Sequence, residues 1–225
     1  MKQITILLAE DHIVVREAFR MMLELENDLK VVGEAQDGRQ AVALVKRLRP
    51  TVVLMDIAMP RLNGLEAARQ ILKAVPTTKV VMLSAQSEAA YVKKATDYGA
   101  TGFLRKQTTA RVLYEAIREV NKGKNFFCPE IANRLNKQNR KSLLRPGLSR
   151  RRGAGLTSRE KEVLQLVAEG SANKQTAVEL GIAVKTVENH RKNLMQKLDI
   201  HDTAGLTRYA IAAGIIESSV LLTFV

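Results

Sequence analysis

The sequence predicts an α/β domain with a doubly wound, five-stranded parallel sheet, followed by a separate all-α domain of four helices. The first 122 residues alternate five times between a short apolar run and a segment with helical periodicity. This alternation is typical of a parallel sheet with helices on both faces. From Leu156 onward the periodicity is only helical. We therefore expect a sheet domain, a basic linker, a helical domain and a tail at residues 1–122, 123–155, 156–216 and 217–225.

The elements of the sheet domain follow from its apolar runs and the helical segments between them. Glycine or proline stands at many of the joints, as at Gly38, Pro50 and Gly99. The predicted strands cover residues 4–9, 31–35, 52–55, 80–83 and 101–104. The predicted helices cover residues 14–25, 39–48, 64–74, 88–98 and 109–121.

The helices of the second domain follow from capping and stop signals. Thr157 and Glu160 have the spacing of a capping box with Thr157 as the N-cap, and Gly170 ends the first helix. The next three helices are predicted at residues 173–180, 184–198 and 203–213, with Gly181 and Gly214 as stops.

The positive charge of the chain is concentrated in its middle. The net charge is +13, to which residues 1–122 contribute +5, residues 123–152 contribute +8 and residues 153–225 contribute 0. A net positive charge favours a polyanionic partner. The basic stretch that contains Arg150–Arg152 is either a solubilising linker or a contact to the DNA backbone. A short helix is expected within it at residues 129–136.

The single cysteine, Cys128, excludes an internal disulfide and fits a reducing cytosol. No apolar run approaches the roughly 18 residues that a membrane-spanning helix needs. The apolar run after Met1 is too short for a signal peptide. We therefore expect a cytoplasmic protein with no membrane partner.

Three carboxylates stand at the carboxyl ends of predicted strands. Glu10 and Asp11 follow the first strand, and Asp56 ends the third. With strand order 2-1-3-4-5, these two strand ends are neighbours at the switch point where such sheets bind ligands. A cluster of carboxylates repels itself unless protons or a cation neutralise it. Mg²⁺ suits these ligands, together with the backbone carbonyl of Ala58.

Two further polar residues are expected at the same edge of the sheet. Ser84 ends the fourth predicted strand and offers a hydroxyl, and Lys106 follows the fifth and offers an ammonium group. A carboxylate nucleophile with a metal, a hydroxyl and a lysine is the set that phosphoryl transfer to aspartate requires. A phosphatase with an aspartate nucleophile typically carries a second aspartate two residues later, where this chain has Ala58.

Residues 3–122 resemble the receiver domain of two-component systems, a flavodoxin-like fold. The resemblance rests on the run MDIAMPRLNG at residues 55–64 and on Glu10, Asp11, Asp56, Ser84, Phe103 and Lys106. It implies that a sensor histidine kinase phosphorylates Asp56 with Mg²⁺ as cofactor. It also implies that Ser84 and Phe103 form the switch that responds to the phosphoryl group.

One residue departs from the receiver pattern. Gln107 follows Lys106, where many receivers have a proline in a cis bond. A cis bond before a residue other than proline costs about 2.5–4 kcal/mol, so we expect a trans bond here.

The helices at residues 173–180 and 184–198, joined by a short turn at Gly181, fit a helix-turn-helix. The second of these helices has an apolar stripe that is expected to face the core, formed by Val187, Leu194 and Leu198. Another face is polar and rich in side chains that read bases, namely Lys185, Glu188, Asn189, Lys192 and Gln196.

The chemistry of these side chains suggests their roles. Asn189 pairs with adenine, Lys192 with guanine and Glu188 with cytosine in the expected complex. Arg191 and Lys174 are expected to contact phosphates, which position the protein without specifying the sequence.

Residues 156–216 resemble the LuxR-type helix-turn-helix, so the whole chain resembles the NarL/FixJ class of response regulators. The motifs are LTSRE at 156–160, ANKQ at 172–175, KTVENHR at 185–191 and KL at 197–198. The resemblance adds Thr186 to the DNA-binding residues. Ala183 replaces the serine that usually caps the helix at residues 184–198, at a typical cost of about 1 kcal/mol. Thr176 replaces an isoleucine, which predicts looser packing of the helix at residues 173–180.

The last helix has a stripe formed by Leu206, Tyr209, Ala210 and Ala213. Core packing is one interpretation of this stripe. The resemblance implies the other, a contact between two copies of the chain, so we expect a two-fold dimer on paired half-sites.

The sequence thus predicts a transcription regulator rather than an enzyme. Phosphorylation of Asp56 would shift its population toward a dimer that binds double-stranded promoter DNA. One alternative keeps the DNA binding and makes the receiver a constitutive dimerisation module with no phosphorylation switch.

Overall fold

The computed structural model describes residues 3–85, 89–127 and 155–216, which form a sheet domain and a helical domain. Cys128, the expected helix at residues 129–136 and Arg150–Arg152 lie outside the described residues.

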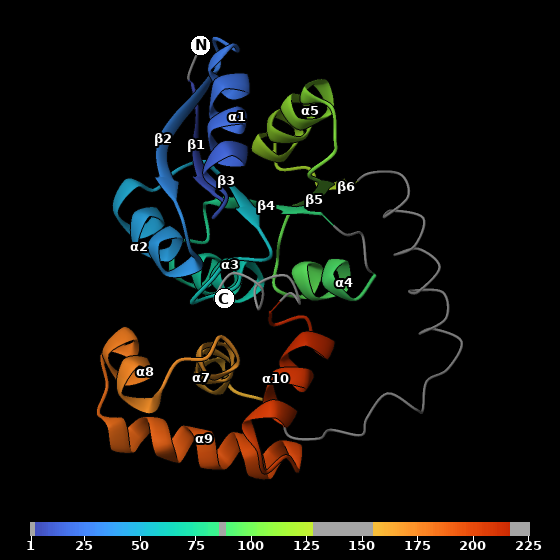
Figure 1. The fold of residues 1–225 in the computed structure, drawn as a ribbon. Coiled ribbons are helices and arrows are strands. Elements are labelled where there is room, and N and C mark those ends of the chain that lie inside the picture. Colours follow the sequence, from blue (N-terminus) through green and yellow to red (C-terminus); the bar gives the residue numbers. More distant parts are fainter. Residues whose placement is uncertain (1–2, 86–88, 128–154, 217–225) are drawn as a thin grey trace. The chain divides into compact units, whose positions relative to one another are not determined.

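The sheet domain has a parallel sheet with the strand order β2-β1-β3-β4-β5-β6 (Figure 1). Its strands are β1 (Ile4–Ala9), β2 (Leu29–Ala35), β3 (Val52–Asp56), β4 (Lys79–Ser84), β5 (Gly102–Arg105) and β6 (Phe126–Phe127). Its helices are α1 (Ile13–Glu24), α2 (Gly38–Leu48), α3 (Gly64–Ala74), α4 (Ala89–Asp97) and α5 (Ala110–Asn121). The predicted doubly wound sheet and its order over the first five strands are confirmed.

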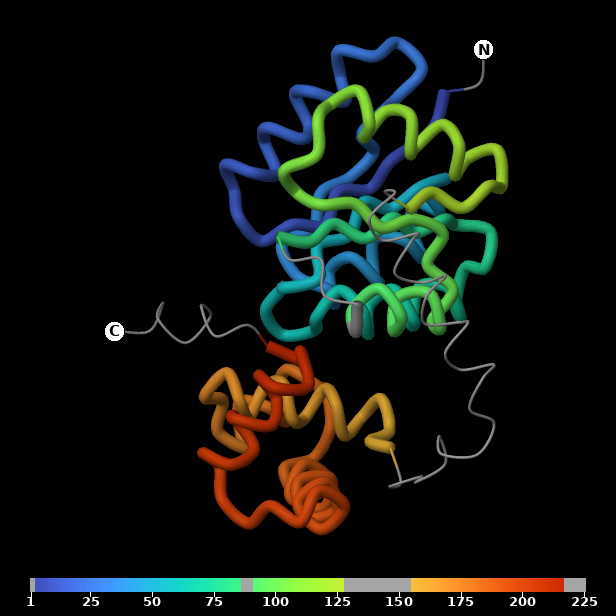
Figure 2. The backbone as a smooth tube through the Cα atoms, turned by 90° about the vertical axis from the view of Figure 1, so that its right-hand side faces the viewer, coloured from blue at the N-terminus to red at the C-terminus, as the bar shows by residue number. Residues whose placement is uncertain are grey.

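Helices cover both faces of the sheet. α1 and α5 lie side by side on one face, and α2, α3 and α4 lie on the other (Figure 1 and Figure 2). The Tyr114 hydroxyl of α5 donates to the Met22 carbonyl of α1 at 2.7 Å, which ties the first pair of helices together. Both faces are therefore removed from water, which explains why the strands read as continuous apolar runs.

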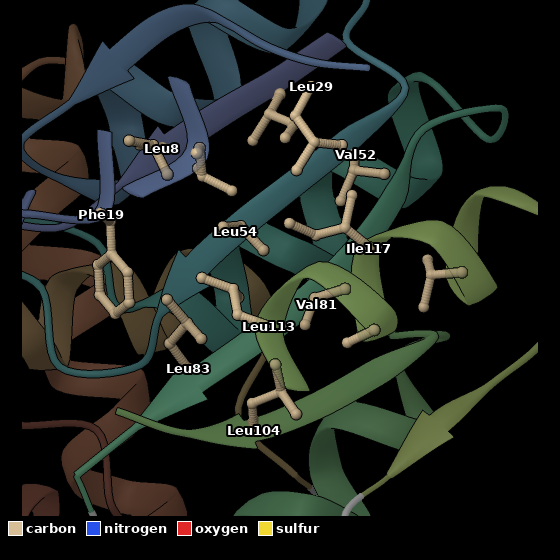
Figure 3. Close-up of a cluster of buried hydrophobic side chains, with 14 of the residues drawn as sticks. Leu8, Phe19, Leu29, Val52, Leu54, Val81, Leu83, Leu104, Leu113 and Ile117 are labelled. Carbon is tan, nitrogen blue, oxygen red and sulfur yellow. The ribbon is translucent and has the colours of Figure 1, made fainter. Parts of the chain in front are cut away.

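The core beneath α1 and α5 is built from alternate residues of the strands. Leu54 and Leu83 point into it, where they meet Phe19 from α1 and Ile117 from α5 (Figure 3). Because side chains alternate along a strand, the fully buried Met55 points to the opposite face, beside Gly64 of α3. The strands therefore supply apolar side chains to both faces of the sheet.

The sixth strand was not predicted. Phe126 and Phe127 pair in parallel with Gly102 and Phe103, and the Phe126 N–H donates to the Thr101 carbonyl at 2.9 Å. Two residues are too few to produce a periodic pattern, so the sequence indicates only a linker here. The sheet therefore extends beyond the boundary expected at residue 122.

The second domain has four helices in its described part, as predicted. The Thr157 side chain accepts the Glu160 N–H at 3.2 Å and Glu160 accepts the Thr157 N–H at 2.7 Å, which confirms the capping box. Gly181 has φ of +61°, as the sharp turn between the second and third helices requires. The helices are α7 (Ser158–Ala168), α8 (Asn173–Leu180), α9 (Val184–Leu198) and α10 (Thr203–Ala212).

The departures noted in the sequence have structural counterparts. Ala183 is the N-cap of α9 and supplies no side-chain hydrogen bond. Thr176 is fully buried in α8, and its hydroxyl has no hydrogen-bond partner among the residues that the structure describes. Gln107 follows a trans bond, as expected, since the described residues contain no cis peptide. Within residues 3–85, 89–127 and 155–216, none of the helices has the length and apolarity needed to span a bilayer.

Candidate functional site

Two buried carboxylates share one ammonium group at the carboxyl edge of the sheet. Glu10 follows β1 and Asp56 ends β3, and their side chains are only 2% exposed. Lys106 follows β5, and its Nζ lies 2.8 Å from Glu10 Oε2 and 3.0 Å from Asp56 Oδ2. The parallel sheet has thus brought together three residues that are far apart in the sequence, as the strand-end argument predicts.

The electrostatics of this group depend on burial. Burial and the neighbouring Glu10 carboxylate raise the pKa of Asp56 to about 7, although Lys106 acts in the opposite direction. Burial acts to lower the pKa of Lys106, but the Asp56 and Glu10 carboxylates outweigh it and the pKa is raised. Lys106 therefore stays protonated beside a carboxylate whose charge is poorly solvated.

Asp11 completes the acidic group. It is half-buried, and burial raises the pKa of its carboxyl group. One buried oxygen of each carboxylate lies within 3.0 Å of a side-chain nitrogen: Glu10 Oε2 and Asp56 Oδ2 of Lys106 Nζ, and Asp11 Oδ1 of His12 Nδ1. Ligand atoms of Glu10 and Asp11 lie within 4.8 Å of each other. Three carboxylates beside a single ammonium group suit a hard cation that prefers oxygen ligands, so these residues fit Mg²⁺.

His12 also belongs to this acidic group and was not predicted from the sequence. Its Nδ1 lies 3.0 Å from Glu10 Oε1 and 2.9 Å from Asp11 Oδ1. Burial acts to lower the pKa of His12, but Asp11 and Glu10 outweigh it and the pKa is raised. The sequence shows that His12 follows an acidic pair, which is a signal for a shared site. It does not show the direction in which the imidazole ring points.

The loop after Asp56 is held against the sheet. The Ile57 N–H donates to the Leu83 carbonyl at 3.2 Å, and the Gly64 N–H donates to the Ile57 carbonyl at 2.9 Å. These bonds fix the course of the chain through Ala58, whose carbonyl was expected to bind the metal.

The two expected switch residues lie on the neighbouring strands. Ser84 is buried at the end of β4, and its carbonyl accepts the Lys106 N–H at 2.8 Å. Phe103 is fully buried on β5, where it pairs with Met82 of β4. The backbone thus couples the end of β4 to the lysine that contacts Asp56.

The helical domain has a polar, exposed face on α9. Val187 and Leu194 are buried in the core and Leu198 packs against it, as predicted. The expected DNA-binding residues Lys174, Lys185, Thr186, Glu188, Asn189 and Lys192 are all exposed.

Arg191 differs from its neighbours on α9, because it is half-buried and bonded within the protein. Its Nη1 donates to Asn173 Oδ1 of α8 at 3.2 Å, and its Nη2 donates to Thr203 Oγ1 of α10 at 2.6 Å. A pocket beside this guanidinium is lined also by Lys192, Gln196 and His201. The sequence predicts a phosphate contact for Arg191 and does not indicate these bonds, which depend on how three helices pack.

The stripe on α10 expected to form a dimer contact is divided between the core and the surface. Leu206 and Ala210 are fully buried within the domain's own core, so for these two residues the dimer interpretation was wrong. Tyr209 and Ala213 are half-buried. Spacing alone did not distinguish the two interpretations, because a core-facing stripe and a dimer stripe follow the same helical period.

Comparison with known proteins supports this two-domain organisation. The model of the response regulator receiver domain matches residues 6–118, and that of the bacterial regulatory proteins of the luxR family matches residues 154–210. The chain is 35% identical over 212 residues to the transcriptional regulatory protein DegU of Brevibacillus brevis, and the match covers 89% of each chain. It is 34% identical over 214 residues to the response regulator protein VraR of Staphylococcus aureus, and the match covers 95% of this chain and 99% of VraR.

A solved structure of the response regulator RcsB in complex with DNA is similar over 92% of this chain and 98% of that one. The TM-score is 0.57 and the identity is 25%. Both family models match in the order of the two domains, and the relatives cover nearly the whole chain. The chain therefore belongs to the LuxR family of DNA-binding two-component response regulators.

Proposed function

We propose that Asp56 accepts a phosphoryl group from a sensor histidine kinase and that this modification controls DNA binding by the helical domain. The observation that carries the proposal is the contact of Lys106 with both Asp56 and Glu10, at 3.0 and 2.8 Å, where two buried carboxylates meet at the carboxyl edge of the sheet. In the reaction an Asp56 oxygen attacks phosphorus as the bond from phosphorus to the kinase histidine nitrogen breaks.

The residues around Asp56 have distinct roles in this proposal. Glu10, Asp11, Asp56 and the Ala58 carbonyl would hold Mg²⁺, which supplies charge neutralisation when bound. Lys106 keeps its ammonium beside Asp56 and pairs with the phosphoryl oxygens.

Ser84 and Phe103 form the switch in this proposal. The Ser84 hydroxyl turns toward the phosphoryl group and donates a hydrogen bond to it, and the Phe103 ring follows into the space vacated. The main-chain N–H of Lys106 donates to the Ser84 carbonyl at 2.8 Å, which supports a common movement of the ends of β4 and β5.

The exposed face of α9 is proposed to enter the major groove. Asn189 would read adenine, Lys192 guanine and Glu188 cytosine, with Lys185 and Thr186 at the start of the helix. Lys174 would contact a phosphate from α8. The exposure of all these side chains supports the assignment.

Phosphorylation is proposed to favour a homodimer on paired half-sites. The contact on α10 would use Tyr209 and Ala213 together with the exposed residues Ala204, Arg208 and Ala212, because Leu206 and Ala210 are occupied in the core.

The test uses an acyl phosphate donor with Mg²⁺ on the full chain. The unmodified protein is expected to incorporate acid-stable, alkali-labile phosphate, and Asp56→Asn is expected to incorporate none. Asp97→Asn, which removes an exposed carboxylate paired with Lys93, serves as the control and should be phosphorylated normally. Continued incorporation into Asp56→Asn would overturn the assignment. DNA affinity that does not respond to the donor would overturn the switch.

A further inference from the structure

Arg16 is a buried cation that the phosphorylation chemistry does not use. It lies in the first turns of α1, and only 7% of its side chain is exposed. A charged side chain is rarely buried to this extent unless partners compensate for its loss of water.

The guanidinium connects β2 to the acidic group. Its Nη1 donates to the main-chain carbonyl of Glu10 at 2.7 Å, and its Nε donates to Glu34 Oε2 at 3.1 Å. The Glu10 N–H donates to the Ala35 carbonyl at 3.0 Å. The backbone of Glu10 is therefore fixed on both sides, by Ala35 directly and by Glu34 through Arg16.

The carbonyl that Arg16 binds belongs to the peptide group between Glu10 and Asp11. A rotation of this peptide plane would turn the two carboxylates relative to each other and relative to Asp56. Small displacements of this kind are costly where several ligands must meet one ion.

We propose that Arg16 and Glu34 are a positioning pair that holds the Glu10–Asp11 peptide, so that both carboxylates meet the cation that Asp56 needs. This inference rests on the proposed function, since it assumes that the acidic group binds Mg²⁺. The pair acts by geometry rather than by charge, because Arg16 contacts the Glu10 carbonyl instead of its carboxylate.

Arg16→Lys tests geometry against charge. Lysine keeps the positive charge but cannot make two divergent hydrogen bonds from one planar group. Partners that orient metal ligands typically change metal affinity by about 10–100-fold, so we expect Arg16→Lys to weaken Mg²⁺ binding by about tenfold. Titration of the full chain with Mg²⁺, without phosphodonor and followed by nuclear magnetic resonance, measures this affinity.

Arg20→Gln is the matched control. Arg20 lies one turn further along α1 and pairs with the same carboxylate as Arg16, since its Nε is 3.4 Å from Glu34 Oε1. We expect Arg20→Gln to change Mg²⁺ affinity less than about twofold, since the bond to the Glu10 carbonyl is kept. Equal Mg²⁺ affinity for Arg16→Lys and the unmodified protein would overturn the inference.

Glu34→Leu keeps the proposal testable if Arg16→Lys does not fold. It leaves both cations on α1 and removes the acceptor that orients the guanidinium, so Mg²⁺ affinity should fall by about tenfold. Unchanged affinity in this variant would overturn the pair. Failure of the proposed function is distinguishable, because phosphate incorporation into the unmodified protein is measured separately from the Mg²⁺ affinity of the variants.

Discussion

A Cβ atom on Gly64 would overlap the main-chain carbonyl oxygen of Asp56, because the first turn of α3 packs directly on the end of β3. The turn is held there by the bond from the Gly64 N–H to the Ile57 carbonyl at 2.9 Å. The side chain of Asn63 caps the same helix by accepting the Glu66 N–H at 3.0 Å. The residue that bears the proposed phosphoryl group is therefore packed against a position that accepts only glycine.

Gly64→Ala is expected to destabilise the sheet domain. The new methyl group must push the Asp56 backbone or α3 aside, and overpacking of this kind typically costs about 1–3 kcal/mol. Urea denaturation of the full chain, monitored through hydrogen exchange of the β3 amides, measures the change in the free energy of unfolding. Gly33→Ala is the comparison, because its Cβ meets only the ends of the Leu7 and Leu48 side chains and should cost less. An equal cost at both positions would contradict the argument.

The strand ends of the site could be predicted from the sequence because topology alone brings them together. Glu10, Asp56 and Lys106 end or follow strands of one parallel sheet, so their meeting required only the strand order. The start of β2 was predicted less accurately. The sequence indicates residue 31, whereas the strand begins at Leu29, since Leu29 pairs with Ile4 of β1.

Thr176→Val is expected to stabilise the helical domain. Thr176 is fully buried, and within the described part of the chain its hydroxyl has no hydrogen-bond partner, so the side chain bears a desolvation cost without compensation. Valine has the same shape and removes the hydroxyl, for an expected gain of about 1 kcal/mol. Native-state hydrogen exchange of α8 amides measures the gain.

The matched control for Thr176 is Thr207→Val on α10. The Thr207 hydroxyl donates to the Thr203 carbonyl at 3.0 Å and is exposed, so its replacement should bring no gain. A loss of stability in Thr176→Val would indicate that the buried hydroxyl has a partner in solution, such as a water molecule.

The ion pair between Glu160 and Lys197 predicts a pH dependence. Burial acts to raise the pKa of Glu160, but hydrogen bonds from Lys197 and Thr157 outweigh it, so the pKa is lowered from 4.5. A carboxylate with a lowered pKa stabilises the fold above its unfolded pKa, and this contribution is lost as the pH falls through the folded pKa. Glu160→Gln should therefore cost about 1 kcal/mol near pH 6.5 and progressively less below about pH 4.5.

Hydrogen exchange of α7 and α9 amides at several pH values measures this contribution of Glu160. Glu188→Gln is the control, because its partner Lys185 is 80% exposed and such pairs contribute little. A cost of Glu160→Gln that is the same at pH 6.5 and pH 3.5 would show that packing of the capping box, rather than its charge, is responsible.

Contacts made by long side chains could not be predicted from the sequence. Arg16 reaches the Glu10 carbonyl and Arg191 reaches Thr203 only because of the angles at which their helices pack. A helical period shows which face a residue occupies, but it does not show which partner lies opposite. The division of the α10 stripe between core and surface depends on packing in the same way.

Arg191→Met is expected to weaken DNA binding without changing its salt dependence. The Arg191 guanidinium is bonded to Asn173 and Thr203, so we expect it to hold α9 in place against α8 and α10. The salt dependence reports contacts to phosphates, each of which contributes about 0.9 to the slope of log K against log salt. Affinity of the phosphorylated protein for a selected DNA site, measured at several salt concentrations, separates the two effects.

Lys192→Met and Lys174→Met provide the comparison, because both lysines are exposed. Lys174→Met should reduce the magnitude of the slope by about 1 while affecting all DNA sequences equally. Lys192→Met should also relax the sequence preference at one base pair, by about 1–3 kcal/mol. Arg191→Met should resemble neither lysine variant, since a displaced α9 weakens all base contacts together. A slope reduced by about 1 in Arg191→Met would mean that this arginine leaves Asn173 and Thr203 on binding and contacts a phosphate, as its place in the sequence first indicated.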